Sequence, residues 1–264
     1  MFAGAWRERR LILQLAQRDA LGRYRGSLMG VAWSFLYPVL MLTVFTFVFS
    51  VVFAARWPGS MGGEGHGRFA LVLFVGVISH ALIAEVLVKS PQLVLSHANY
   101  VKKVVFPLET LAWSMIFSAA FHMLVSLSIL MLATLVLTGG LPIHALWLPP
   151  ILLPLLGLAL GLAWLLSSLG VFLRDIGQIT GVLATVMMFL SPVFYPITAL
   201  PESFRAFIYA NPITLPIEQA RGALFAAQAP DLVALSKYYL VAFTVMCIGY
   251  WWFQRTRRGF ADVL

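Results

Sequence analysis

The sequence predicts an all-α integral membrane protein with six transmembrane helices, and three observations lead to that fold class. The 264-residue chain is 61% hydrophobic and 11% charged, with a mean hydropathy of +0.91, whereas soluble domains carry about a quarter charged residues. Several apolar runs are long enough to cross a hydrocarbon core of about 30 Å. The Lys and Arg residues lie mainly at the ends of those runs. Because no long polar linker interrupts the chain, residues 1–264 are predicted to form a single transmembrane domain.

Residues 1–27 are basic and precede the first apolar run. A helical wheel from Arg10 to Leu21 has two faces, with Asp19 as the exception: the polar face holds Arg10, Gln14, Gln17 and Arg18, and the apolar face holds Ile12, Leu15, Ala16 and Ala20. This pattern predicts an amphipathic helix in the membrane interface, and an exposed tail is the alternative. The next apolar run is far longer than the core of a signal peptide, so it predicts a retained anchor.

The predicted spans are residues 28–55, 69–88, 108–137, 151–173, 176–195 and 235–253. The first exceeds the length that about 30 Å requires, so a tilt or a kink at Pro38 is expected. A polar segment from Lys89 to Pro107 separates the second and third spans. Arg174 and Asp175 mark a tight turn between the fourth and fifth spans.

Residues 196–234 contain two short segments, Pro201 to Ala210 and Pro216 to Ala227. Each begins with proline and has an acid early, Glu202 or Glu218, as helix starts favour. Each is too short to cross a bilayer. Both are therefore predicted to be re-entrant or interfacial helices on one side of the membrane.

The distribution of basic residues predicts the orientation. With the N-terminus inside, thirteen of the 18 Lys and Arg residues lie on the inner segments and five on the outer ones. Both termini are therefore predicted to be cytoplasmic. The same distribution explains the net charge of +8 better than nucleic-acid binding does.

Motifs for nucleotide, metal or thiol chemistry are missing from the sequence. A phosphate-binding loop needs Gly directly before its Lys, and the four lysines instead follow Val88, Val101, Lys102 and Ser236. No cluster of His, Cys and acids has metal-ligand spacing, and Cys247 is the single cysteine. The chain is therefore not expected to be an enzyme, and ATP-driven transport would need a separate ATPase.

Three ionisable residues in apolar runs, His80, Glu85 and His122, have two interpretations each. Glu85 lies one helical turn before Lys89, which favours a local ion pair over a proton relay. His80 and His122 could either form hydrogen bonds between helices or belong to a proton relay. No series of acids crosses the membrane, which argues against a proton-coupled carrier.

Large side chains recur at every fourth position of the first span: Trp33, Tyr37, Met41, Phe45, Phe49 and Phe53. A spacing of four makes a stripe that winds slowly around a helix. Aromatic faces can hold sugar rings while letting them slide, so Trp33, Tyr37, Phe45, Phe49 and Phe53 are candidates for a substrate path. The alternative is that the stripe faces lipid or forms interfacial belts.

Several motifs in order resemble the membrane permeases of type-two ABC exporters of polysaccharides, which carry O-antigen, capsule or teichoic acid. The matching stretches are Arg23 to Gly30 with Trp33 and Pro38; Asn99 to Pro107 with Glu109; Phe172 to Ile176; Ser191 to Pro196 with Asn211, Pro212 and Arg221; and Phe260 to Asp262. Met29 departs from the leucine that is more usual in the family. The resemblance covers essentially the whole chain and is closest to the O-antigen permeases.

The resemblance implies a homodimer with two cytoplasmic ATP-binding subunits, which hold the ATP and Mg²⁺, and transport of a lipid-linked polysaccharide across the bacterial inner membrane. It implies an ATPase contact or cytoplasmic gate at Arg18, Arg23, Arg25, Asn99, Tyr100, Lys102 and Lys103. It also implies a periplasmic gate at Pro201, Phe204, Phe207, Asn211, Pro212 and Arg221. An ion-coupled carrier and a membrane-embedded lipid or sugar enzyme are the alternatives. The missing proton relay and the missing acidic metal-binding motif count against them.

Overall fold

The structure is a computed structural model that describes residues 1–24, 26–52, 57, 66–103 and 106–264. Those residues form helices and contain no strand, which confirms the all-α prediction. The α-helices are α1 (Phe2–Arg7), α2 (Arg9–Gly22), α3 (Trp33–Phe45), α4 (His66–Leu93), α5 (Ala98–Lys103), α6 (Glu109–Thr138), α7 (Leu148–Phe172), α8 (Ile176–Phe189), α9 (Glu202–Ala210), α10 (Thr214–Phe225), α11 (Leu232–Thr256) and α12 (Phe260–Val263). A 3₁₀ turn, Gly30–Ala32, precedes α3, and a π-helical segment, Thr46–Val52, follows it.

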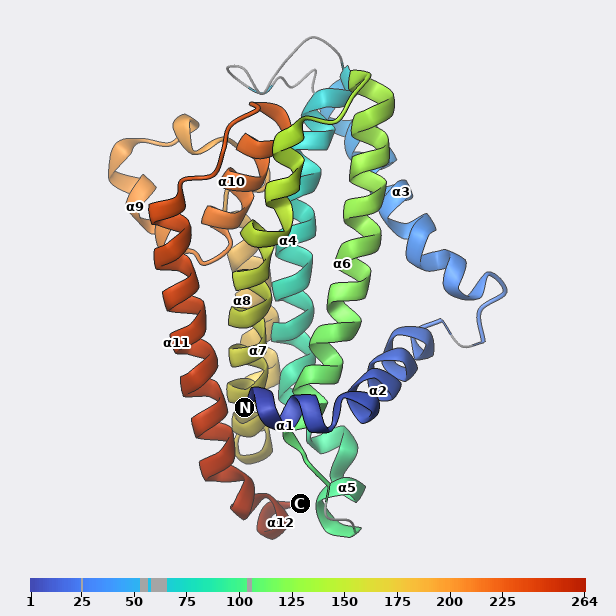
Figure 1. Cartoon of the computed structure of the whole chain (residues 1–264), viewed down its shortest axis with the longest axis vertical. Coiled ribbons are helices and arrows are strands. Elements are labelled where there is room, and N and C mark those ends of the chain that lie inside the picture. The colour runs from blue at the N-terminus through green and yellow to red at the C-terminus, as the bar shows by residue number, and fades with distance from the viewer. Residues whose placement is uncertain (25, 53–56, 58–65, 104–105) are drawn as a thin grey trace.

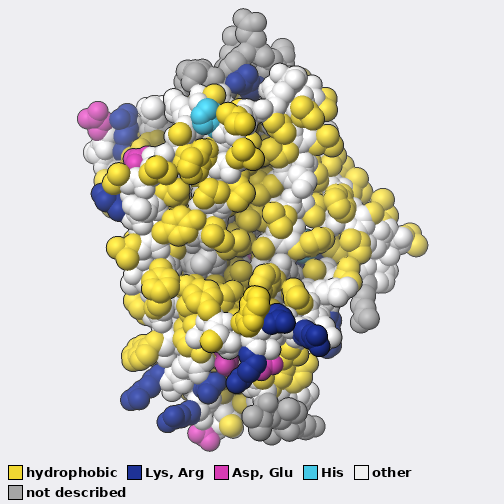
Figure 2. Space-filling model, in the orientation of Figure 1, with side chains coloured by type: hydrophobic (Ala, Val, Ile, Leu, Met, Phe, Trp, Pro, Cys, Tyr) yellow, Lys and Arg dark blue, Asp and Glu magenta, His cyan; other side chains and the backbone are white. Residues whose placement is uncertain are grey.

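The long helices stand side by side, and both chain termini lie toward the same end of the bundle (Figure 1). We call this end, which also holds α5 and α12, the terminal end. The opposite end holds α9, α10 and the Gly139–Gly140 connection, and we call it the loop end. Figure 2 shows a broad hydrophobic band across the middle of the visible face, with most Lys and Arg side chains toward the terminal end.

Five helical segments within the described residues are long and apolar enough to cross a membrane: Gly30–Phe49, Gly67–Leu93, Glu109–Thr138, Ile143–Phe172 and Leu232–Val263. They correspond to the first, second, third, fourth and sixth predicted spans. The fifth predicted span, 176–195, contains the shorter helix Ile176–Phe189. Helix length therefore supports five of the six predicted spans.

Helix α8 is shorter than predicted because the chain turns at Leu190 and continues into Pro192. Proline has no N–H to donate, and it disfavours helical geometry in the residue before it. Hydropathy alone did not reveal this end, because the residues that follow remain largely apolar.

Although short, α8 runs antiparallel to α4. Gly177, at its start, lies near Gln92 at the terminal end of α4. In the middle, His80 Nε2 donates a hydrogen bond to the Ala184 carbonyl at 2.9 Å. The segment after α8 reaches Gly76 of α4, and α8 thus returns the chain from the terminal end toward the loop end.

The interior of the bundle is built on α4 and α7. In each, 67% of the most apolar 18-residue window is buried, against 11% for the first span and 22% for α6. Trp164 of α7 is completely buried. It packs edge-on against Trp113 of α6 and Tyr250 of α11, with ring centroids 5.8 and 5.0 Å apart. The remaining helices therefore surround α4 and α7, and their outer sides form the apolar surface.

Two glycines bring α7 and α11 into backbone contact. A Cβ atom at Gly161 would lie 2.6 Å from the Val245 carbonyl oxygen, and one at Gly249 would lie 2.1 Å from the Gly161 carbonyl oxygen. Small residues at such a crossing let helices approach closely, which strengthens dispersion contacts where no water drives association. This crossing joins the C-terminal helix to the interior.

Helix α2 has the two faces that its sequence predicts. Ile12, Ala16 and Ala20 are buried, while Arg10 and Arg18 are exposed. The apolar face packs against α6 (Figure 1). A polar outer face and an apolar inner face are thus present, and the position of α2 in a membrane interface stays a prediction.

Candidate functional site

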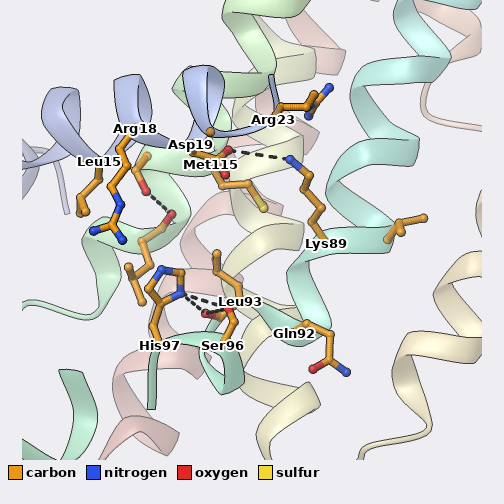
Figure 3. Close-up of a pocket in the computed structure, with 14 residues that line it drawn as sticks. Leu15, Arg18, Asp19, Arg23, Lys89, Gln92, Leu93, Ser96, His97 and Met115 are labelled. Carbon is orange, nitrogen blue, oxygen red and sulfur yellow. Dashed lines mark hydrogen bonds and ion pairs between the residues drawn. The ribbon is translucent and has the colours of Figure 1, made fainter. Parts of the chain in front are cut away.

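A cleft of about 630 Å³ opens at the terminal end between α2, α4, α6 and the 3₁₀ turn Leu95–His97 (Figure 3). Its walls combine apolar side chains with charged ones from helices distant in sequence. The lining residues with charged or polar side chains are Arg18, Asp19, Arg23, Lys89, Gln92, Ser96, His97 and Ser114. We call it the terminal cleft.

Ion pairs connect the N-terminal helix to α4 along one wall of the terminal cleft. Arg23 pairs with Glu85, and Lys89 pairs with both Glu85, at 2.9 Å, and Asp19, at 3.8 Å. The Glu85 side chain is 15% exposed, so its pairs are less screened by water than the pair with Asp19, which is 44% exposed. These contacts fasten the end of α2 to α4.

The opposite wall of the terminal cleft carries His97 and Ser96. The His97 Nδ1 atom lies 2.8 Å from the Leu93 carbonyl oxygen and 3.1 Å from the Ser96 hydroxyl. Arg18 extends from α2 toward the same side of the cleft as His97 (Figure 3). The terminal cleft therefore has cationic and hydrogen-bonding groups on both sides of its opening.

The predicted ATPase-contact residues fall into three groups. Arg18 and Arg23 line the terminal cleft. Asn99 is exposed on α5, where Tyr100 stacks on Phe106 with centroids 4.5 Å apart. Lys102 and Lys103 belong to α5, and Arg25 lies outside the described residues. The structure thus brings α2 and the segment leading into α5 to one end, on either side of one cleft.

The aromatic stripe of the first span divides into two parts. Trp33 and Tyr37 line a second cavity, of about 360 Å³, between α3, α4 and α6. Phe45 and Phe49 instead pack against the core, and Phe49 stacks on Phe69 and Phe194, with centroids 5.6 and 6.1 Å apart. Phe53 lies outside the described residues. The predicted substrate stripe therefore does not present one uniform surface within the protomer.

The loop end carries the two predicted short helices, α9 and α10. Helix α9 follows Pro201 and is largely exposed, with Phe204 and Phe207 at 59% and 73% exposure. Helix α10 is mostly buried against α4 and α7. Of the predicted gate residues, Phe204 and Phe207 therefore lie on a superficial helix and Arg221 on an embedded one, whereas Pro201, Asn211 and Pro212 lie just outside these helices.

Asn211 joins these short helices to α8. Its Nδ2 atom donates to the carbonyls of Leu190 and Met187, at 2.9 and 3.3 Å, which lie at the C-terminal end of α8. Its Oδ1 atom accepts from the Ile213 N–H at 3.2 Å. Pro212 follows directly and supplies no N–H. A single side chain therefore caps α8 and shapes the turn between α9 and α10.

Arg221 of α10 is completely buried. Its guanidinium pairs with Glu218 at 3.0 Å and lies 4.4 Å from the centre of the Trp57 ring. It also donates to three backbone carbonyls, those of Val72, Pro192 and Val193.

These partners belong to α4 and to the turn after α8, so Arg221 holds three segments together. Burial lowers its pKa to about 10, and the neighbouring Glu218 acts in the opposite direction. Because that pKa remains well above neutral pH, the group stays charged and keeps all its donors. Gly76 leaves the necessary space, since a Cβ there would lie 2.9 Å from the Val193 Cα.

His80, Glu85 and His122, the three ionisable residues of the apolar runs, do not form a proton path. Glu85 is paired with Lys89, as its spacing predicts, and His80 makes the interhelical bond to Ala184. His122 Nε2 is buried without a hydrogen-bond partner in the described part of the chain. These contacts favour the structural interpretation of Glu85 and His80 over a proton relay.

Sequence reasoning missed an ion pair between distant helices. Arg257, after α11, pairs with Glu109, at the start of α6, at 3.2 Å. The Glu109 carbonyl also accepts from Trp164 Nε1. No spacing rule connects residues 148 positions apart. The sequence indicated only that Arg257 and Glu109 each lie at the end of a predicted helix, which does not pair them.

Comparison with known proteins places these features in a family. The family model described as ABC-2 type transporter matches residues 10–225. Two proteins named O-antigen export system permease protein RfbA, from Myxococcus xanthus and Klebsiella pneumoniae, are each 25% identical over 256 residues. Each alignment covers 96% of this chain and 95% of the relative.

A second Klebsiella pneumoniae protein of that name is 22% identical over 255 residues. The family match extends from α2 to the end of α10, and therefore includes the terminal cleft, the interior helices and the Arg221 contacts. The chain belongs to the ABC-2 type transporter family and is a multi-pass membrane protein.

Proposed function

We propose that this chain is the channel-forming permease of an ATP-driven exporter that moves a lipid-linked polysaccharide, O-antigen, across the bacterial inner membrane. The observation that carries the proposal is the similarity to O-antigen export permeases along 96% of the chain. The terminal cleft and the two short helices at the opposite end support it, because an exporter needs a coupling end and an exit end. The permease acts as a homodimer with two ATP-binding subunits, which hold ATP and Mg²⁺.

In this proposal the chain crosses the membrane six times. Both termini lie toward one end of the bundle, so an even number of crossings is required. At about 1.5 Å per residue, α8 spans about 21 Å, and the turn that includes Ser191 and Val193 continues its course to the loop end. The excess of Lys and Arg on the terminal segments makes that end cytoplasmic.

In the same proposal α2 and the 95–103 segment bind the ATPase at the terminal cleft. The ion pairs of Asp19, Arg23, Glu85 and Lys89 would then transmit a displacement of α2 directly to α4. At the other end, α9 gates the exit, while Asn211 and Arg221 connect its neighbours to α8 and α4.

The experiment is genetic and biochemical. Deleting the gene for this chain, with the ATPase gene intact, should leave lipid-linked glycan on the cytoplasmic side and remove it from the cell surface. The purified permease should hydrolyse no ATP, whereas the permease co-purified with its ATPase should. Normal surface glycan in the deletion strain would refute the substrate assignment, and equal hydrolysis by the isolated permease would refute the division of labour.

A further inference from the structure

The second cavity, between α3, α4 and α6, has the composition of a lipid-headgroup site. One end is polar, with Arg23, Tyr24 and Glu85. The other is mainly apolar, with Ile78, Leu82 and Met123 beside two polar residues of α6, His122 and Ser126. Trp33 and Tyr37 stand at its rim, at 37% and 60% exposure. Glu85 lies nearer the terminal end of α4 than Ile78 and Leu82 do, and Arg23 pairs with it, so the polar end faces the terminal side.

The charges that line this cavity are one cation and one anion, Arg23 and Glu85. Both cations that bind Glu85, Arg23 and Lys89, contact the same oxygen, Oε1. Among the described residues, Oε2 accepts no hydrogen bond. A carboxylate has about four acceptor positions, so Glu85 retains capacity for another donor.

Arg23 has donor capacity as well. A guanidinium carries five N–H groups, and the ion pair with Glu85 engages Nη2. The side chain is 37% exposed, so its remaining donors can be reached. Burial raises the pKa of the neighbouring Tyr24 phenol, which keeps that hydroxyl protonated and able to donate. The polar end therefore offers donors for a phosphate beside an acceptor for a cation.

We propose that this cavity binds a resident phosphatidylethanolamine molecule. Its phosphate accepts hydrogen bonds from Arg23, its ammonium donates to Glu85 Oε2, and the faces of Trp33 and Tyr37 attract the ammonium. A choline headgroup has no N–H to donate, and a glycerol headgroup brings no cation to the carboxylate. The apolar end accommodates the upper part of an acyl chain.

The proposal is independent of the export substrate, and the delipidated full-length chain tests it. Native mass spectrometry should measure binding of phosphatidylethanolamine, phosphatidylcholine and phosphatidylglycerol with identical acyl chains. We expect one site that prefers phosphatidylethanolamine by about tenfold, which corresponds to about 1.4 kcal/mol. Equal affinities, or a preference for phosphatidylglycerol, would overturn the proposal.

Variants locate the site. Glu85→Gln should reduce the preference for ethanolamine over choline to near unity. Because an aromatic face attracts any ammonium, including choline, Tyr37→Leu should instead weaken the preference for phosphatidylethanolamine over phosphatidylglycerol, and Tyr37→Phe should retain it. Trp251→Leu is the matched control, because Trp251 is 62% exposed on α11 and outside the cavity. If the Glu85→Gln variant does not fold, the comparison of Tyr37→Leu with Tyr37→Phe tests the site. An unchanged preference for phosphatidylethanolamine over phosphatidylglycerol in Tyr37→Leu would overturn the assignment.

A competition arm separates a resident lipid from the lipid carrier of the glycan. Undecaprenyl phosphate also has a phosphate and an apolar tail, but it lacks an ammonium. Retention of phosphatidylethanolamine at an equal concentration of undecaprenyl phosphate supports the resident lipid. Displacement by undecaprenyl phosphate would assign the cavity to the carrier and refute the proposal.

Discussion

Arg221 illustrates how one side chain can determine the arrangement of several segments. Three carbonyl oxygens and Glu218 accept hydrogen bonds from its guanidinium, which is itself completely buried. Each buried carbonyl left without a partner costs about 1–3 kcal/mol. The arginine is therefore needed because its planar fork serves several acceptors at once.

Replacing Arg221 with Met is expected to lower the free energy of unfolding by about 3–5 kcal/mol, since Glu218 and the carbonyls lose their partner. Arg221→Lys should recover only part of this, because one ammonium cannot reach all acceptors. The measurement is the melting temperature of the purified chain. Arg205→Gln is the control, since Arg205 also bonds a carbonyl, at 3.1 Å, but is 35% exposed. Equal melting temperatures for the Arg221 and Arg205 variants would contradict this role.

Phe49 and Tyr37 lie in one sequence stripe but have different surroundings. Phe49 stacks on Phe69 and Phe194, so Phe49→Ala should cost about 2–3 kcal/mol and reduce the amount of folded protein. Tyr37 is 60% exposed, so Tyr37→Ala should leave folding nearly unchanged. Fluorescence-detected size-exclusion chromatography of both variants measures this difference. A normal yield for Phe49→Ala would mean that its ring contacts contribute little.

At the scale of elements, packing of α7 on α11 depends on the absence of side-chain atoms. Gly within a helix is less favourable than Ala by about 0.5–1 kcal/mol, and the close backbone contact at this crossing gives a steric reason for Gly at both positions. A Cβ atom at Gly161 or Gly249 would meet backbone atoms, which cannot rotate away. The two helices must therefore separate if either glycine is replaced.

Gly161→Ala and Gly249→Ala are each expected to lower stability by about 1–3 kcal/mol, the usual cost of overpacking. Gly157→Ala is the matched control on α7, because no atom lies within 4 Å of its added Cβ. Thermal melting in detergent compares the three. The explanation would be abandoned if Gly161→Ala melted at the same temperature as Gly157→Ala.

At the scale of the whole molecule, the proposed orientation follows from where the chain ends lie and from the charge distribution. A periplasm-active reporter fused after Leu264 should be inactive, whereas the same reporter inserted at Gly140 should be active. Gly140 is exposed at the loop end, and a Cβ there meets no neighbour, so an insertion is tolerated. Activity of the C-terminal fusion would reject the orientation with both termini cytoplasmic.

Patterns that repeat along one helix were readable from the sequence. The apolar runs predicted helices α4, α6, α7 and α11, and the wheel of residues 10–21 predicted which face of α2 is buried. The spacing of Glu85 and Lys89 predicted their ion pair. Each of these depends on hydropathy or on helical periodicity, which act over a few residues.

The sequence by itself determined an all-helical membrane protein, because its apolar composition and the period of its helices are local properties. Only the tertiary structure decided which side chains meet across helices. It buried Arg221 among carbonyls from α4 and the turn after α8. It also divided the aromatic stripe between a cavity and the core. Such contacts depend on how separate helices approach and rotate, and no spacing along the chain encodes that geometry.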